Sequence, residues 1–242
     1  MPRKILILGG TGDARELASQ LVARGHVVTT SFAGVTSAPK LPAGEIRFGG
    51  FGGADGLRKF LTDEHFNVLV DATHPYAQNI SANTALAVQG LDILHLRLER
   101  PAWQPVSGDE WISVSGIEEA AQALPSGSCA LITIGRKSLA LFFKREDLRG
   151  IVRCIEPPAE NLPHNWHLIL ERPPFSIVAE MDLIKSISAT HLVTKNAGGE
   201  GTYAKIAAAR TLNLPVVMVS RPAKNGGLAL RNIADVIGKC VE

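Results

Sequence analysis

Four side chains able to exchange protons or hydrogen bonds stand within six positions, directly after an apolar run. They are Asp71, Thr73, His74 and Tyr76, and Pro75 restricts the backbone between them. A histidine can donate a proton near neutral pH, and loops at the carboxyl ends of parallel strands bind ligands in α/β proteins. We expect Asp71, His74 and Tyr76 to act in catalysis and Thr73 to contact a cofactor. The alternative is a simple connection, in which Asp71 caps a helix, His74 is solvated and Tyr76 packs on the core.

A glycine-rich turn follows the first apolar run of the chain. Its residues are Gly9, Gly10, Thr11, Gly12, Asp13 and Ala14. Small residues let backbone N–H groups approach a diphosphate, and the start of the next helix adds a favourable dipole. The match to G-x-G-x-x-G is partial, because Arg15 stands where the third glycine belongs. We expect a dinucleotide at this turn and Asp13 as the cap of the helix. The alternative is a tight turn without a ligand.

The stretch from Thr29 to Gly34 indicates which dinucleotide fits. A fold that prefers NAD carries a carboxylate about 20 residues past the glycines, and this stretch has none. A carboxylate would repel a 2′-phosphate, so its absence favours NADP(H), with Thr30 and Ser31 as the contacts or as ordinary strand residues. Gly49 and Gly50 belong to a second glycine cluster, either a backbone that passes over a flat ligand or a loose surface loop.

Two further strand ends combine cations, an amide and glycines, which suits anionic groups of a substrate. Their candidate residues are Arg136, Lys137, Lys195, Asn196, Gly198 and Gly199. The first of these strand ends is no Walker A loop, because Ala130 replaces the glycine that the motif requires five positions before Gly135. A basic surface loop is the alternative there. A lysine at the second strand end favours function, because it is an unusual packing residue.

These loops must be positioned by strands and helices that alternate along the chain. Apolar runs predict strands at 5–8, 27–31, 45–48, 68–71, 93–98, 111–114, 130–134, 151–155, 168–171, 191–194 and 216–220. Amphipathic stretches predict one helix between its cap Asp13 and Gly25, which ends it, and further helices at 57–64, 80–89, 117–124, 138–143, 175–186 and 202–212. The expected fold is α/β, with two Rossmann-like domains whose mainly parallel sheets face a central cleft. Residues 1–98 form the cofactor-binding domain and 99–242 the second domain, which contributes to the substrate cleft. The segment 99–108 is the linker.

Composition narrows the class of protein further. The chain has 242 residues, is 45% hydrophobic and carries a net charge of +2, which excludes a disordered chain and argues against a nucleic-acid partner. Its three cysteines form no disulfide framework, so we expect a reducing, cytoplasmic location. No apolar run approaches a membrane span or a signal peptide core. The histidines are scattered, so no metal site is expected. The Tyr-x-x-x-Lys, G-x-S-x-G and H-E-x-x-H patterns are missing.

Taken together, the motifs are similar to those of a known family. Gly9-Gly10-Thr11-Gly12-Asp13-Ala14-Arg15, Asp71-Ala72-Thr73-His74-Pro75-Tyr76-Ala77, Thr133-Ile134-Gly135-Arg136-Lys137 and Thr194-Lys195-Asn196-Ala197-Gly198-Gly199 occur in this order, and the stretch 207–210 leads to 215–218. In this the chain resembles the precorrin-6A reductase family of cobalamin biosynthesis over nearly its whole length.

The resemblance implies an NADPH-dependent oxidoreductase that delivers a hydride to the precorrin-6A macrocycle and gives precorrin-6B. Its tetrapyrrole substrate carries acetate and propionate arms, which Arg136, Lys137, Lys195 and Arg15 would meet. The nicotinamide would lie near Thr73 and His74, and Asp71, His74, Tyr76 or Lys195 would manage a proton if one is needed. We expect a monomer or a weak oligomer.

Three alternatives stay open. The first is the cobalt-bearing macrocycle of the oxygen-independent branch. The second is a different NADP(H) oxidoreductase that acts on a smaller anion. The third is a non-catalytic module of two α/β lobes, which would bind a ligand without turnover.

Overall fold

Every strand that the structure describes runs parallel to its neighbours in one of two six-stranded sheets. The computed structural model describes residues 1–32 and 41–241. It divides into two compact units, the first made of Met1–Pro101 and Pro222–Glu242 and the second of Ala102–Arg221. The expected fold class, α/β with parallel sheets in two Rossmann-like domains, is confirmed.

The first sheet has the strand order of a dinucleotide-binding fold. Its strands are β1 (Lys4–Leu8), β2 (Val27–Phe32), β3 (Glu45–Phe48), β4 (Val68–Asp71), β5 (Leu94–Leu98) and β12 (Leu228–Leu230). Their order is β3-β2-β1-β4-β5-β12, so the chain reverses direction across the sheet between β1 and β4. Ligands of open α/β sheets bind at the carboxyl ends of the strands that flank such a point. The glycine turn after β1 and the loop after β4 both lie there.

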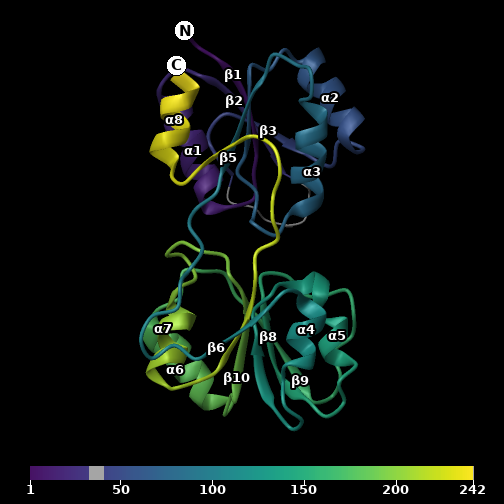
Figure 1. Cartoon of the computed structure of the whole chain (residues 1–242), viewed down its shortest axis with the longest axis vertical. Helices are drawn as coiled ribbons and strands as arrows, with labels where there is room; N and C mark the ends of the chain where they lie inside the picture. The colour runs from purple at the N-terminus through teal and green to yellow at the C-terminus, as the bar shows by residue number, and fades with distance from the viewer. Residues whose placement is uncertain (33–40, 242) are drawn as a thin grey trace. The chain divides into compact units, whose positions relative to one another are not determined.

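Helices cover both faces of the first sheet (Figure 1). They are α1 (Gly12–Ala23) and α8 (Ile233–Val241) on one face and α2 (Ala54–Asp63) and α3 (Gln78–Ala87) on the other. β1 supplies both cores, since Ile5 and Ile7 pack with α1 and α8 while Leu6 and Leu8 pack with α2. This burial on both faces explains why β1 is apolar at consecutive positions.

The cap of α1 differs from the expectation. Thr11 is the N-cap, and its hydroxyl accepts a hydrogen bond from the Ala14 N–H at 3.1 Å. Asp13, which the sequence predicted as the cap, lies two residues after Thr11, inside the first turn of the helix, and pairs with Arg100 instead. Gly25 follows the C-cap with a φ of 83°, a left-handed conformation that ends the helix as predicted.

The second unit repeats the α/β architecture with another strand order. Its strands are β6 (Trp111–Val114), β7 (Cys129–Ile132), β8 (Arg149–Cys154), β9 (Trp166–Leu170), β10 (His191–Lys195) and β11 (Val216–Val219). The order β6-β11-β10-β7-β8-β9 places the reversal between β7 and β10. The two cation-bearing loops of the sequence follow these two strands.

The helices of the second unit also lie on both faces of its sheet (Figure 1). They are α4 (Ile117–Gln122) and α5 (Ala140–Phe143) on one face and α6 (Ile177–Ser186) and α7 (Ala204–Thr211) on the other, with a short 3-10 helix at Arg136–Ser138. Within the described residues, no helix is long and apolar enough to cross a membrane.

The C-terminal segment differs from the expected division. The sequence assigned all of 99–242 to the second domain and predicted no strand or helix after residue 220. In the structure β12 pairs with β5, and Val236, Ile237 and Cys240 of α8 join the core formed by α1 and β1. The segment therefore completes the first unit, and the chain crosses to the second unit and returns.

Candidate active site

The turn after β1 places two glycines, and so backbone without side chains, at the reversal point of the first sheet. The Gly9 N–H donates to the Ser31 carbonyl at 2.9 Å, and a Cβ on Gly9 would lie 2.7 Å from Thr30 Cγ2. Only glycine permits this close approach. Gly10 has a φ of 112° and open space where a Cβ would point. The turn can therefore receive phosphate oxygens on its N–H groups.

Thr11 joins this turn to the loop after β4. While its hydroxyl caps α1, it also donates to the Ala72 carbonyl at 2.9 Å. Asp13 pairs with Arg100 at 2.8 Å, and Arg15 Nη1 donates to the Thr11 carbonyl at 3.4 Å. The charged side chains of the predicted glycine motif are thus engaged by the protein, and its backbone is the part open to a ligand.

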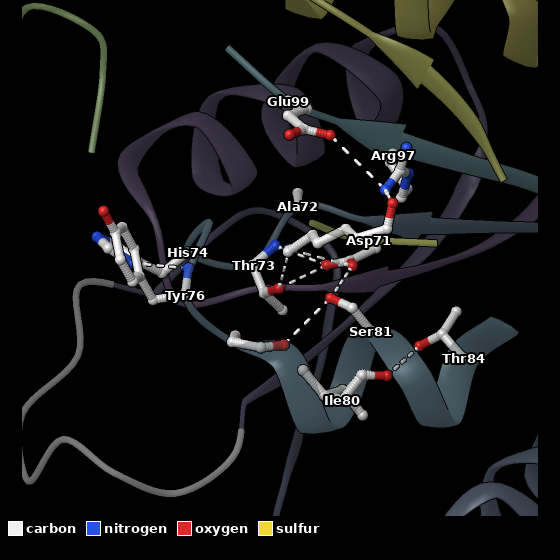
Figure 2. Close-up of polar contacts among 12 residues, drawn as sticks. Asp71, Ala72, Thr73, His74, Tyr76, Ile80, Ser81, Thr84, Arg97 and Glu99 are labelled. Carbon is white, nitrogen blue, oxygen red and sulfur yellow. Dashed lines mark hydrogen bonds and ion pairs between the residues drawn. The ribbon is translucent and has the colours of Figure 1, made fainter. Parts of the chain in front are cut away.

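Asp71, the last residue of β4, lies at the centre of a buried hydrogen-bond cluster (Figure 2). Its side chain has 0% exposure. One carboxylate oxygen, Oδ1, accepts from the Thr73 N–H at 3.0 Å and from the Thr73 hydroxyl at 2.5 Å. The other, Oδ2, accepts from the Ser81 hydroxyl at 2.5 Å and from Lys224 Nζ at 3.3 Å. The two carboxylate oxygens therefore accept four hydrogen bonds between them.

This cluster keeps Asp71 ionised. Burial alone raises the pKa of Asp71, but the Lys224 ammonium and the hydrogen bonds from Ser81 and Thr73 outweigh burial, so the pKa lies below its usual value. A carboxylate that is ionised and fully covered is unsuited to give a proton to a ligand. Its observed contacts fix the position of Thr73 in the loop.

Lys224 is a residue of this site that the sequence argument missed. It lies 153 positions after Asp71, in the segment that returns to the first unit, and it also donates to the Thr73 hydroxyl at 3.2 Å. Arg97 on β5 donates to the Lys224 carbonyl at 2.6 Å and pairs with Glu99 at 3.7 Å. No local pattern around Lys224 signals this role, because its partners come from distant parts of the chain.

His74 and Tyr76 lie on the side of the loop away from Asp71 (Figure 2). His74 is exposed, and its Nδ1 accepts from the Tyr76 N–H at 3.4 Å. The two rings lie 5.6 Å apart between centroids. The loop therefore has two parts, a buried anchor made by Asp71 and Thr73 and an accessible pair made by His74 and Tyr76.

The two hydroxyl side chains at the end of β2, which the sequence predicted as coenzyme contacts, are buried. Thr30 has 0% exposure and Ser31 has 4%. Ala33 and Gly34, which belong to the same sequence argument, lie outside the described residues. Arg47, on the neighbouring strand β3, donates to the Ser31 hydroxyl at 3.3 Å. Arg47 lies two positions before Gly49 and is not among the residues that the sequence predicted for the site.

The reversal point of the second sheet carries the predicted cations. The Thr133 N–H donates to the Val193 carbonyl at 2.9 Å, which joins the ends of β7 and β10. Arg136 pairs with Glu156 at 3.3 Å, and Lys137 is exposed. Burial lowers the pKa of Lys195. The cations of both loops therefore lie at one edge of this sheet, the edge where ligands of α/β folds bind.

Asn196 and Gly199 have contacts that the sequence did not predict. Asn196 Oδ1 accepts from the Trp103 N–H at 2.8 Å, and its Nδ2 donates to the Trp103 carbonyl at 2.9 Å. The Trp103 indole donates to the Gly199 carbonyl at 2.8 Å. These groups hold the segment that enters the second unit, whereas Gly198 supplies a left-handed turn with a φ of 66°.

The fold and this site define an α/β protein of the Rossmann class, with a glycine turn at the reversal point of its first sheet. The family model described as "Precorrin-6x reductase CbiJ/CobK" matches residues 4–240. The chain belongs to this family, as the resemblance of its motifs implied.

Known proteins agree with this membership. The chain is 42% identical to "Precorrin-6A reductase" of Rhodococcus erythropolis over 221 residues, which cover 90% of this chain and 89% of the relative. It is 30% identical to "Cobalt-precorrin-6A reductase" of Priestia megaterium, with 96% of each chain covered. The solved structure "CobK precorrin-6A reductase" superimposes with a TM-score of 0.93 at 35% identity, and covers 99% of this chain and 96% of that one.

Proposed function

We propose that the chain catalyses the NADPH-dependent reduction of precorrin-6A to precorrin-6B. The observation that carries the proposal is the glycine turn at the reversal point of a sheet with dinucleotide-binding strand order, in a chain of the precorrin-6x reductase family. The curated relatives called precorrin-6A reductase are oxidoreductases by name, and the NADP(H) form of the coenzyme rests on the absence of a carboxylate at the end of β2.

The residues present fit a dinucleotide. The diphosphate would rest on the N–H groups of the turn between Gly10 and Ala14, where the open face of Gly10 leaves room for it. The coenzyme supplies the hydride when bound. Thr11 holds the two loops of the site together, and Asp71 with Lys224 fixes Thr73 at the end of β4. The chain's main contribution is a rigid frame that limits the geometry of the reactants.

A proton donor, where one is needed, comes from the accessible part of the loop. His74 and Tyr76 fit this role better than Asp71, whose carboxylate is ionised and covered. Lys195 is a second source, because burial lowers the pKa of its ammonium and so makes release of a proton easier.

The substrate's acetate and propionate arms suit the cations of the second sheet. Lys137 is exposed at the end of β7, and Arg136 and Lys195 flank the same reversal point. Arginine and lysine bind carboxylates through charge-assisted hydrogen bonds. The three buried cysteines are free thiols, which supports the cytoplasm as the location.

Similarity favours the metal-free macrocycle as the substrate. The relatives called precorrin-6A reductase are 37% to 42% identical to this chain. Those called cobalt-precorrin-6A reductase are 27% to 30% identical. The cobalt-bearing macrocycle is therefore the second candidate.

The test is anaerobic mixing of the protein with NADPH and either macrocycle. We expect loss of the nicotinamide absorbance with precorrin-6A, and a much slower loss with the cobalt form. Binding of NADPH without oxidation in the presence of either macrocycle would contradict the proposal and favour a non-catalytic module. Faster oxidation with the cobalt form would reverse the order of the two substrates.

A further inference from the structure

We infer that Arg47 recognises the 2′-phosphate of the coenzyme and thereby determines the preference for NADPH over NADH. The inference rests on the proposed function, since it assumes that a dinucleotide binds along the carboxyl edge of the first sheet. It assigns a specificity-determining role to a residue that lies outside both loops of the reversal point.

The strand register places Arg47 at the edge where the adenosine ribose of a dinucleotide rests. β1 pairs with β2 at Leu8 and Ser31, and β2 pairs with β3 at Ser31 and Arg47. The three residues therefore form a row across the carboxyl ends of three neighbouring strands, and the row begins beside the glycine turn. In dinucleotide-binding sheets the second strand ends at the ribose, and a nearby arginine accommodates a 2′-phosphate.

The guanidinium of Arg47 is held in place by neutral groups. Its Nη1 donates to the Ser31 hydroxyl at 3.3 Å and to the Gly49 carbonyl at 2.7 Å, and its Nη2 donates to the Gly50 carbonyl at 2.8 Å. The guanidinium carbon lies 3.9 Å from the ring centre of Phe51. These contacts fix the orientation of the side chain before any ligand arrives, which lowers the entropic cost of binding.

The charge of Arg47 is not neutralised within the described part of the chain. No carboxylate there pairs with it, whereas Arg97, Arg100, Arg136, Arg145, Arg153 and Arg210 each pair with an acidic side chain. The nearest acidic residue along β3 is Glu45, whose carboxylate accepts from the Thr29 hydroxyl at 2.8 Å. A guanidinium has five N–H donors, and three are used. The remaining donors and the full positive charge suit a dianionic phosphate.

This assignment explains two features that the sequence argument left open. Ser31 was predicted to contact the phosphate, but it is 4% exposed and accepts a hydrogen bond from Arg47. Gly49 and Gly50 were predicted to pass over the ligand, and their carbonyls hold the guanidinium. Both sets of residues then act on the coenzyme through Arg47.

A purely structural role is the competing explanation, because the same contacts fix the glycine cluster after β3. The two roles differ in one measurable quantity, the selectivity for the 2′-phosphate. Loss of a structural contact weakens the binding of every adenosine ligand alike. Loss of the phosphate contact weakens only the ligands that carry the phosphate.

The experiment compares 2′,5′-ADP with 5′-AMP, and NADPH with NADH, by calorimetry on the whole protein without a macrocycle. In the wild type we expect the 2′-phosphate to tighten binding by roughly 10- to 100-fold, the range of a charge-assisted contact. Arg47→Ala should remove most of this difference and leave Kd for NADH within about threefold, with Arg47→Lys in between. Lys59→Ala, which removes an exposed cation of α2 that pairs with Asp63, is the matched control and should change neither the selectivity for the 2′-phosphate nor Kd for NADH.

The outcomes separate this inference from the proposed function. An unchanged ratio of the two Kd values in Arg47→Ala overturns the role of Arg47 and leaves the reductase proposal standing. If Arg47→Ala is too unstable to measure, the role of Arg47 is tested by Arg47→Lys and by the two ligands on the wild type. Equal binding of 2′,5′-ADP and 5′-AMP by the wild type also overturns the role of Arg47. Wild-type protein that binds no adenosine ligand contradicts both proposals.

Discussion

At the scale of single residues, the site depends on a charge pair with almost no contact with water. Side-chain exposure is 6% for Lys224 and 0% for Asp71. A buried pair contributes little net stability compared with apolar residues, but removal of one partner leaves an uncompensated charge. The pair joins the loop after β4 to the returning segment of the chain, so its loss affects the site and the fold together.

Lys224→Met should therefore lower the free energy of unfolding by about 3 to 5 kcal/mol, because Asp71 stays buried without its cation. Urea unfolding measures the change. Lys4→Met, which removes a surface pair with Glu64 at 3.0 Å, is the control and should cost less than about 1 kcal/mol.

The double variant Asp71→Asn with Lys224→Met should recover part of that loss, because no lone charge remains buried. Equal losses of unfolding free energy in Lys224→Met and Lys4→Met would show that breaking the buried pair costs no more than breaking a surface pair.

Lys205, in the second unit, is another buried cation, and it lies among charged residues. Arg153 on β8 pairs with Glu180 on α6 at 2.7 Å, and Lys205 at the start of α7 is 5% exposed. Burial lowers the pKa of Lys205 from 10.5 to about 8, with a smaller contribution in the same direction from Arg153 and an opposing one from Glu180. The folded protein holds this proton less tightly than the unfolded chain does.

The free energy of unfolding therefore depends on pH through Lys205. From about pH 8 to 10.5 the unfolded chain keeps a proton on Lys205 that the folded chain has released, so stability rises with pH over this interval. Lys205→Met should raise the free energy of unfolding at pH 7 by about 1 to 3 kcal/mol and remove that rise. Lys185→Met, on the exposed side of α6, is the control. Parallel pH profiles for wild type and Lys205→Met would refute the assignment.

At the scale of elements, the last segment of the chain is part of the first unit. Val236 of α8 has 0% exposure and packs in the core of α1 and β1, while Val241 of the same helix is 56% exposed. Val236→Ala should cost about 1 to 3 kcal/mol of unfolding free energy because it opens a cavity in this core. Val241→Ala should cost less than about 0.5 kcal/mol. Denaturation of the two variants checks this, and equal effects would show that α8 does not belong to the core.

Strands and helices were predictable where the local pattern is strong. β3, β4 and β6 begin and end at the predicted residues. Each is a short segment between turn residues, and β4 is buried along its whole length, the pattern expected for a strand covered on both faces. β12 has three residues, Leu228 to Leu230, and two of them are exposed, so its sequence carries no such pattern. Its pairing with β5 is a long-range contact, which a local pattern does not encode.

The candidate site divides in the same way. The glycine turn and the 71–76 loop were predictable, because residue type and position after a strand identify them. The Thr11 cap is a local contact with Ala14, and the sequence offered two residues able to cap the helix, Thr11 and Asp13, of which the prediction took the wrong one. The contact of Lys224 with Asp71 and that of Arg47 with Ser31 were missed because both depend on how distant segments come together in the sheet. Their positions along the chain give no sign of these contacts.

At the scale of the whole molecule, each unit places its functional loops by one topological rule. The reversal between β1 and β4 gathers the glycine turn and the 71–76 loop, and the reversal between β7 and β10 gathers the cations. In a parallel sheet, the loops on either side of a reversal splay to opposite faces and leave space for a ligand. The same rule occurs in both units, and the proposed function would place the coenzyme at the first reversal and the anionic groups of the substrate at the second.

The proposed reaction passes a hydride from the coenzyme to the macrocycle. The most direct measurement is anaerobic turnover of precorrin-6A with NADPH that is deuterated on both sides of the reacting nicotinamide carbon, followed by mass spectrometry of the product. We expect deuterium bound to a carbon of the reduced macrocycle. A reduced macrocycle without deuterium, or an unchanged macrocycle, would contradict it.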